Sequence, residues 1–186
     1  MDRQIEALPT RLFGITVHHN FNAFFCFEFL FSLFDFDTVI ELGTASGGLS
    51  LFLWLHQHIK RKKFYTFDKR EERSHCNSGY PDELFDRLGI DLWLGDLRSE
   101  NTKEVVRQLI AKGGRTFIYC DNGNKALEFQ DFAPCLKSGD VIGVHDWGLE
   151  IFEKDTKLLA EEVGLVGLID DLPEKLGTMQ KFWLKP

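Results

Sequence analysis

The sequence predicts an α/β fold, a three-layer sandwich built on a mostly parallel seven-stranded sheet. Two observations support this prediction. Short apolar segments rich in Val, Ile, Phe and Tyr alternate with longer helical segments, and a glycine-rich turn at residues 43–48 follows the first of the regular apolar segments. Short apolar runs are typical of strands buried on both faces, and strand–helix alternation is typical of a parallel sheet covered by helices.

The elements follow one another in a regular order. We expect strands at residues 38–42, 63–67, 91–94, 115–120, 140–145, 165–169 and 180–184. Helices are expected between them at residues 49–58, 82–88, 102–111, 126–136 and 151–163. Glycines mark several of the breaks, among them Gly89, Gly139 and Gly164. No long helix separates the last two strands, which allows them to pair as an antiparallel hairpin.

Length and composition indicate one globular domain covering residues 1–186. The chain has a net charge of −7 and no broadly basic face, which argues against nucleic-acid binding. No apolar segment is long and uncharged enough for a membrane span. The four cysteines have no metal-like or disulfide-like spacing, which favours a reducing compartment, so we expect a cytoplasmic protein.

The N-terminal region is unusually aromatic. The chain has 18 Phe residues, and many of them lie in the segment 21–36. Its aromatic side chains fall on most faces of a helix, which indicates a helix that is buried or shared with another subunit. We therefore expect residues 1–36 to form a helical extension or cap, and we expect a homodimer to form through the Phe-rich helix.

Three acidic residues follow consecutive strands of the first half. Glu41 lies at the end of the strand 38–42, Asp68 follows the strand 63–67, and Asp96 follows the strand 91–94. A carboxylate about 20 residues beyond a glycine-rich turn can accept hydrogen bonds from both ribose hydroxyls of a nucleoside. Asp96 is placed to accept a hydrogen bond from an exocyclic adenine amine. The pattern predicts a nucleoside-cofactor site.

The glycine-rich turn distinguishes between two cofactors. A dinucleotide site requires a second glycine that lets the backbone approach a pyrophosphate, and Ala45 stands at that position. Glu41 would also repel a diphosphate, whereas it attracts the sulfonium and ammonium groups of S-adenosylmethionine. The turn therefore favours S-adenosylmethionine over NAD. We expect the donor to be held by Glu41, Gly43, Thr44, Ser46, Gly47, Asp68 and Asp96.

Together these motifs resemble class I S-adenosylmethionine-dependent methyltransferases over about residues 37–186. The resemblance implies a Rossmann-like fold whose last strand is antiparallel to the sheet. The segment 41–48 resembles the family's first motif, Asp68 its ribose acid, and Gly95-Asp96 its adenine-side motif. The resemblance is nearest to the catechol-type and cephalosporin-hydroxylase-like O-methyltransferases, which implies methyl transfer to a small-molecule hydroxyl. The alternatives are a non-catalytic subunit that binds S-adenosylmethionine or S-adenosylhomocysteine, and an NAD-dependent oxidoreductase.

A second set of candidate residues follows the fourth and fifth expected strands. Asp121 follows the strand 115–120, and His145 and Asp146 lie at the end of the strand 140–145. The resemblance implies that residues here bind the acceptor, and two carboxylates with room for water can hold Mg²⁺. His145 is a departure from the family pattern. As a ligand it favours Mn²⁺, Fe²⁺ or Zn²⁺, as a metal-free base it would take the acceptor proton, and as a structural residue it would close the strand end.

Other polar and aromatic residues are weaker candidates. His18, His19 and Asn20 precede the aromatic helix and either cap it or line the acceptor pocket, and we favour the cap. The side chains of His56 and His58 point apart on a helix, which favours a solvated surface over a metal site. Lys125 is a candidate base, and Trp147 either stacks on an acceptor ring or packs under a loop. His75 and Tyr80 are candidate contacts to adenine or substrate.

Overall fold

The computed structural model describes residues 10–69, 82–112 and 114–186. One seven-stranded sheet runs through the molecule in the order β5-β4-β3-β6-β7-β9-β8. Its strands are β3 (Thr38–Leu42), β4 (Lys63–Asp68), β5 (Asp91–Leu94), β6 (Thr116–Cys120), β7 (Val141–Val144), β8 (Val166–Leu168) and β9 (Lys181–Leu184). The first five are parallel, and β9 runs antiparallel to both β7 and β8. The expected fold class, with an antiparallel last strand, is confirmed.

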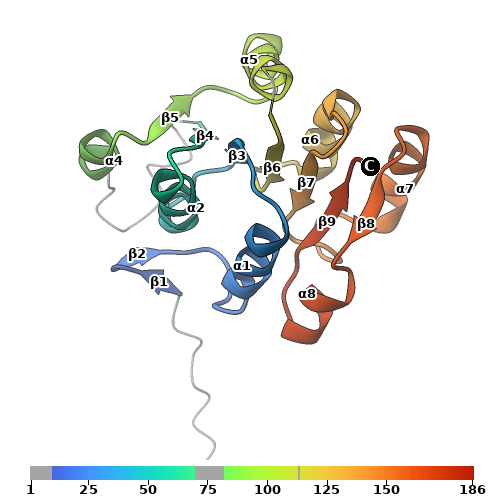
Figure 1. The fold of residues 1–186 in the computed structure, drawn as a ribbon, viewed down its shortest axis with the longest axis horizontal. Coiled ribbons are helices and arrows are strands. Elements are labelled where there is room, and N and C mark those ends of the chain that lie inside the picture. Colours follow the sequence, from blue (N-terminus) through green and yellow to red (C-terminus); the bar gives the residue numbers. More distant parts are fainter. Residues whose placement is uncertain (1–9, 70–81, 113) are drawn as a thin grey trace, which may run out of the picture.

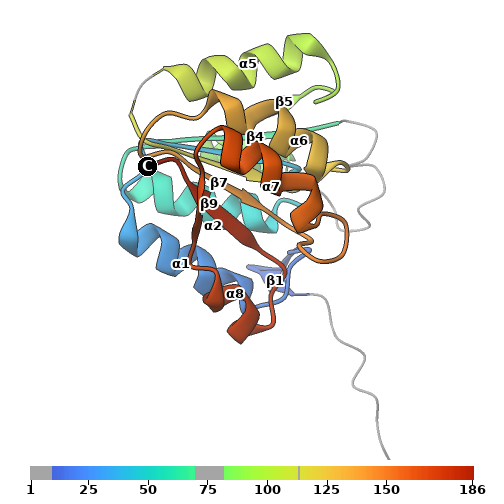
Figure 2. The same cartoon turned by 90° about the vertical axis from the view of Figure 1, so that its right-hand side faces the viewer.

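Helices cover both faces of the sheet. On one face lie α5 (Glu100–Ala111), α6 (Lys125–Phe132) and α7 (Glu153–Glu162), and on the other lie α1 (Ala23–Leu33), α2 (Gly48–Ile59) and α8 (Asp171–Leu176) (Figure 2). The short α4 (Asp82–Leu88) packs beside α2 through Phe85. Each layer encloses its own apolar core, because alternate residues of the buried strands point to opposite faces. No described helix is long and apolar enough to cross a membrane.

Several boundaries differ from expectation for local reasons. The helix expected at 126–136 ends at Phe132 and continues as a short 3₁₀ turn, Ala133–Cys135, because Pro134 has no N–H to continue the α-helical pattern. The helix expected at 151–163 begins at Glu153, and the Asp155 carboxylate accepts a hydrogen bond from the Phe152 N–H at that end. The connection before the last strand holds the six-residue α8.

The described part of the N-terminal extension contains a hairpin as well as a helix. Strands β1 (Arg11–Leu12) and β2 (Ile15–Thr16) pair antiparallel around a tight turn. Phe13 and Gly14 both have positive φ, the geometry of a two-residue hairpin turn. The hairpin is followed by α1, and the Asn20 and Asn22 side chains donate hydrogen bonds to carbonyls at the end of α8. These bonds fix the N-terminal segment against the C-terminal part of the fold (Figure 1).

The sheet register sets the position of every candidate residue. Leu42, the last residue of β3, pairs with Phe67 on one side and with Cys120 on the other. Cys120 in turn pairs with Val144. The residues that follow β3, β4, β6 and β7 therefore meet at one edge of the sheet, the carboxyl edge where open α/β sheets bind ligands.

Candidate active site

The turn between β3 and α2 depends on glycine at two positions. Gly43 has φ +106°, and a Cβ there would collide with the backbone carbonyl of Asp121. Gly47 has φ +82° and precedes the first turn of α2. Ala45 also has a positive φ, and its N–H donates a 2.7 Å hydrogen bond to Asp68 Oδ2. The structure thus brings the turn, the acid at the end of β4 and the chain after β6 into contact.

Glu41 lies beneath this turn and is fully buried. Its Oε2 accepts hydrogen bonds from the Ser50 hydroxyl and, at 2.6 Å, from the Thr66 hydroxyl, which also contacts the Thr44 hydroxyl. Burial raises the pKa of Glu41 to about 8, although these two hydroxyls lower it in part. In the protein without ligand, Glu41 is therefore mostly protonated at neutral pH, and a nearby cation would favour its ionised form.

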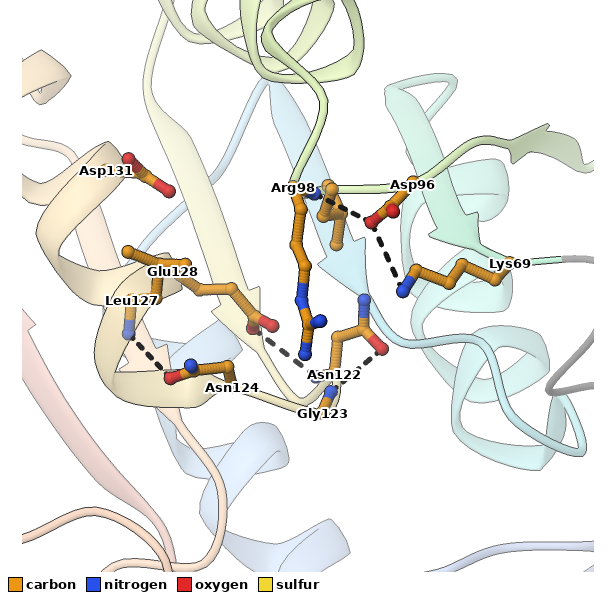
Figure 3. Close-up of a pocket in the computed structure, with 10 residues that line it drawn as sticks. Lys69, Asp96, Arg98, Asn122, Gly123, Asn124, Leu127, Glu128 and Asp131 are labelled. Atoms are coloured by element: carbon orange, nitrogen blue, oxygen red, sulfur yellow. Dashed lines mark hydrogen bonds and ion pairs between the residues drawn. The ribbon is translucent and has the colours of Figure 1, made fainter.

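A pocket opens beside the turn, between the chain after β5 and the chain after β6 (Figure 3). Lys69, Asp96 and Arg98 lie on one side, and Asn122 and Glu128 are among the residues on the other. Asp96 accepts a hydrogen bond from the Arg98 N–H and lies 3.2 Å from Lys69 Nζ. Most of the residues that line the pocket are polar or charged, and they offer both hydrogen-bond donors and acceptors.

Glu128 is a pocket residue that the sequence reasoning missed. It is almost completely buried at the start of α6, and its Oε2 accepts a hydrogen bond from the Asn122 N–H. Burial raises the pKa of Glu128 to about 8. The sequence around Glu128 is that of an ordinary amphipathic helix and does not single this residue out. Only the fold shows that its side chain faces the pocket.

A cluster of three side chains lies on the other side of the turn. His145 Nδ1 lies 2.9 Å from Asp121 Oδ1, and His19 Nε2 lies 3.3 Å from Asp121 Oδ2. The two imidazole rings are in contact, with centroids 4.0 Å apart. His19 comes from the segment before α1, whereas Asp121 and His145 follow the adjacent strands β6 and β7. The expected adjacency of Asp121 and His145 is present, and His19 joins them.

Asp146, the third expected member of this set, is held by a lysine. Lys125 Nζ lies 2.7 Å from Asp146 Oδ2 and 2.8 Å from Glu150 Oε2. Asp146 Oδ1 is also 3.3 Å from His145 Nδ1. Burial of Lys125 lowers its pKa, but the two carboxylates outweigh that effect and raise the pKa above its ordinary value. Lys125 is therefore charged at neutral pH, which excludes it as the general base considered from the sequence.

Electrostatics keep the cluster in a defined protonation state. Burial lowers the pKa of His19 from 6.5 to about 4, although the neighbouring Asp121 opposes this. His19 is therefore a neutral imidazole at pH 7. Burial raises the pKa of Asp121, but the two histidines outweigh burial, so the net shift is downward and the carboxylate is ionised. A buried anion beside the neutral His19 imidazole can accept a proton, orient a hydroxyl or bind a cation.

The segment 18–20 contacts both parts of the site, the glycine-rich turn through His18 and the Asp121 cluster through His19. His18 Nε2 makes a 2.9 Å hydrogen bond with the Ser46 hydroxyl in the glycine-rich turn. The Asn20 side chain accepts a hydrogen bond from the N–H of Ala23, the first residue of α1, whereas the N-cap residue Asn22 makes no side-chain cap. His19 points into the Asp121 cluster instead of capping. Its only signal in the sequence was its place before the aromatic helix.

The remaining candidates have structural contacts. Trp147 packs edge-on against Trp183 with ring centroids 5.5 Å apart. His56 lies 3.0 Å from Glu28 and stacks on Phe31, so it is a surface residue as expected. His75 and Tyr80 lie outside the described residues.

Comparisons with known proteins identify the fold. No protein-family model and no curated protein matches the sequence. Among solved structures, CmcI with Mg-SAM has a TM-score of 0.60 at 19% identity, covering 78% of this chain and 62% of CmcI. The chain has the fold of CmcI. CmcI with SAH gives a TM-score of 0.56 at 17% identity over 78% of this chain and 72% of that chain. The apo structure of CmcI gives a TM-score of 0.57 at 17% identity, covering 90% of this chain and 64% of that chain.

Proposed function

We propose that this protein transfers a methyl group from S-adenosylmethionine to a hydroxyl of a small molecule. One observation carries the proposal: the Asp121 cluster abuts the glycine-rich turn, since Gly43 packs on the Asp121 backbone and the Asp121 N–H donates to the Leu42 carbonyl. A donor bound at the turn and an acceptor bound at the cluster would be neighbours. The likeness to CmcI, whose structures carry SAM and SAH, supports this choice of donor.

The donor would lie along the carboxyl edge of β3, β4 and β5. In this arrangement Asp68 would contact the ribose, and the pocket with Asp96 would hold the adenine. Glu41 beneath the turn would stabilise the cationic end of the donor. Gly43, Thr44, Ser46 and Gly47 shape the backbone around it. The turn favours this donor over NAD, because Ala45 stands where a dinucleotide site has its second glycine.

The acceptor hydroxyl would be oriented by Asp121, with His145 beside it. The hydroxyl oxygen attacks the methyl carbon as the sulfur–carbon bond breaks, so S-adenosylhomocysteine leaves and the hydroxyl proton passes to a base. Asp121 or His145 would accept that proton, and Asp146, 3.3 Å from His145 Nδ1, would help to orient the imidazole. Catalysis then rests mainly on positioning and on a more anionic nucleophile.

A divalent metal fits this part of the site as well. The ring nitrogens of His19 and His145 and a carboxylate oxygen of Asp121 lie within 4.8 Å of one another, close enough to share one ion. His19 would then replace Asp146 in the ligand set expected from the sequence, because Asp146 is paired with Lys125. A bound divalent ion lowers the pKa of an acceptor hydroxyl.

The direct test is a methyl-transfer assay with labelled S-adenosylmethionine and a panel of phenols, catechols and sugars. We expect turnover of at least one hydroxyl compound, and a fall of roughly 100-fold or more in Asp121→Asn. The exposed Asp86→Asn on α4 is the matched control and should keep full activity. Binding of S-adenosylhomocysteine without turnover of any acceptor would favour the non-catalytic alternative.

We also propose a homodimer that forms through α1. Phe21, Phe25, Phe29 and Leu33 recur every four residues and are between 46% and 61% exposed, which makes one apolar stripe on the outer side of this helix. Large exposed apolar stripes are typical of interaction surfaces. We further propose that residues 1–186 form a single methyltransferase domain with residues 1–36 as its cap. The free thiols of Cys26, Cys120 and Cys135 are consistent with a cytoplasmic location.

A further inference from the structure

His19 presents an unusual arrangement of polar atoms. Its side chain is 2% exposed, and neither ring nitrogen makes a hydrogen bond within the described part of the chain. Nε2 lies 3.3 Å from Asp121 Oδ2, yet outside hydrogen-bonding geometry. Buried polar atoms are nearly always satisfied, because leaving one unpaired costs free energy. An imidazole placed in this way is explained by a ligand that fills the space between His19 and its neighbours.

The neighbours of His19 supply the remaining donors for such a ligand. A ring nitrogen of His145 and an oxygen of Asp121 lie within 4.8 Å of a ring nitrogen of His19. Metal bonds to nitrogen and oxygen are about 2.0–2.2 Å long, so donor atoms around one ion stand roughly 3–4 Å apart. Small side-chain movements bring the three donors to that spacing.

The cluster has fewer oxygen ligands than a typical Mg²⁺ site. Mg²⁺ prefers oxygen ligands, and carboxylates usually provide them. Here Asp146 is engaged by Lys125 at 2.7 Å, a lysine that also lies 2.8 Å from Glu150 and 3.7 Å from Asp121. One carboxylate and two imidazoles are left. Imidazole nitrogen suits Fe²⁺, Co²⁺, Ni²⁺ and Zn²⁺, and a set of two histidines and one carboxylate is typical of non-haem Fe²⁺ sites.

We propose that His19, Asp121 and His145 bind a first-row transition-metal ion in preference to Mg²⁺, with His19 as a direct ligand from the N-terminal segment. The inference deepens the proposed function, since its part in catalysis rests on methyl transfer at the same edge. The ion would link the segment 18–20 to the ends of β6 and β7. Because His18 bonds to Ser46, the same segment also contacts the donor turn.

The test is a titration of the purified full-length chain with Co²⁺, followed by visible absorption and by calorimetry. We expect one Co²⁺ per chain, with a visible band that a large excess of Mg²⁺ does not remove. His19→Gln and His145→Gln should each weaken Co²⁺ binding by more than the ~10-fold typical of lost outer-sphere partners. The matched control is His58→Gln, a surface histidine that stacks on Trp54 and should bind Co²⁺ as the wild type does.

His19→Cys gives a second readout that does not depend on affinity. If residue 19 is a ligand, this variant should add a thiolate-to-Co²⁺ charge-transfer band that the wild type lacks. Absence of the band in folded His19→Cys would overturn the proposal. Displacement of Co²⁺ by Mg²⁺ at comparable concentrations would overturn it as well, and so would unchanged Co²⁺ binding in His19→Gln.

A parallel titration with S-adenosylhomocysteine separates this inference from the proposed function. Donor-product binding by a wild type that binds no metal would overturn the metal site and leave the methyltransferase proposal standing. Co²⁺ binding with the expected variant effects, but without S-adenosylhomocysteine binding, would support the metal site and count against methyl transfer. His19→Gln that still binds S-adenosylhomocysteine is folded, so its loss of Co²⁺ reports on the ligand alone.

Discussion

At the scale of single residues, Gly43 carries the tightest requirement in the site. It combines a positive φ with direct packing on the backbone after β6, so it holds the donor turn and the acceptor cluster together. A side chain there must displace either the turn or Asp121. This contact explains why a glycine is needed at this position, whatever ligand the turn holds.

Gly43→Ala should therefore destabilise the protein by roughly 2–4 kcal/mol through backbone strain and overpacking. Urea unfolding followed by circular dichroism measures the change. Gly123→Ala is the matched control, since Gly123 has no positive φ and open space around its Cβ position. Equal stability of the two variants would show that the close approach at Gly43 is not needed.

The ionisation of Glu41 should make the free energy of unfolding depend on pH. Its pKa rises on folding from 4.5 to about 8, so the folded state favours the protonated form. The stabilisation is complete below pH 4.5 and is lost as the pH rises toward 8. His19 acts in the opposite sense, because its pKa falls from 6.5 to about 4 and its contribution is lost on acidification through that range. Between pH 6.5 and 8, the effect of the buried carboxyl groups on stability can therefore be measured without that of His19.

As the pH rises through that window, the free energy of unfolding of the wild type should fall. The free energy of unfolding of Glu41→Gln should fall less steeply. Glu128, whose pKa is also about 8, accounts for the remaining slope, so the double variant with Glu128→Gln should be nearly flat. Urea denaturation at several pH values measures both slopes. Identical slopes in wild type and Glu41→Gln would mean that Glu41 is already ionised in the folded protein.

At the scale of the element, α1 has two distinct faces. Phe24, Phe27 and Leu30 pack into the core, and Phe27 contacts both Tyr119 and Phe182. The opposite side carries the exposed stripe Phe21, Phe25, Phe29 and Leu33. The helix is apolar nearly all round, which fits an element buried on one side by its own chain and on the other by a second copy.

Phe25→Ser together with Phe29→Ser should convert a dimer into a monomer without loss of fold. Sedimentation velocity measures the association, and near-ultraviolet circular dichroism checks the core. Leu158→Ser is the control, because Leu158 is 79% exposed on α7, away from the stripe. A wild type that is monomeric at high concentration would contradict the dimer.

At the scale of the whole molecule, local patterns predicted the sheet well. The strands 38–42 and 91–94 have the expected bounds, since β3 is buried along its whole length and the mostly exposed edge strand β5 lies between Gly89 and Gly95. The antiparallel pairing of the last two strands followed from the short connection between them. The hairpin β1–β2 was missed because strands of two residues have no periodicity to detect.

The site was predictable only where it follows strand ends. Glu41, Asp68 and Asp121 each lie at the carboxyl end of a parallel strand, a position that sequence reveals. His19 and Glu128 come from a loop and a helix, and their place in the site depends on long-range packing. The pairing of Lys125 with Asp146 is likewise a tertiary contact. It changes the chemistry expected of both residues.

Calorimetric titration with S-adenosylhomocysteine and with NAD decides which of the two cofactors the protein uses. We predict that the wild type binds S-adenosylhomocysteine and not NAD, and that Asp68→Ala weakens this binding by roughly 10-fold or more, as expected for the loss of a buried charged hydrogen-bonding partner. Binding of NAD without binding of S-adenosylhomocysteine would contradict the account.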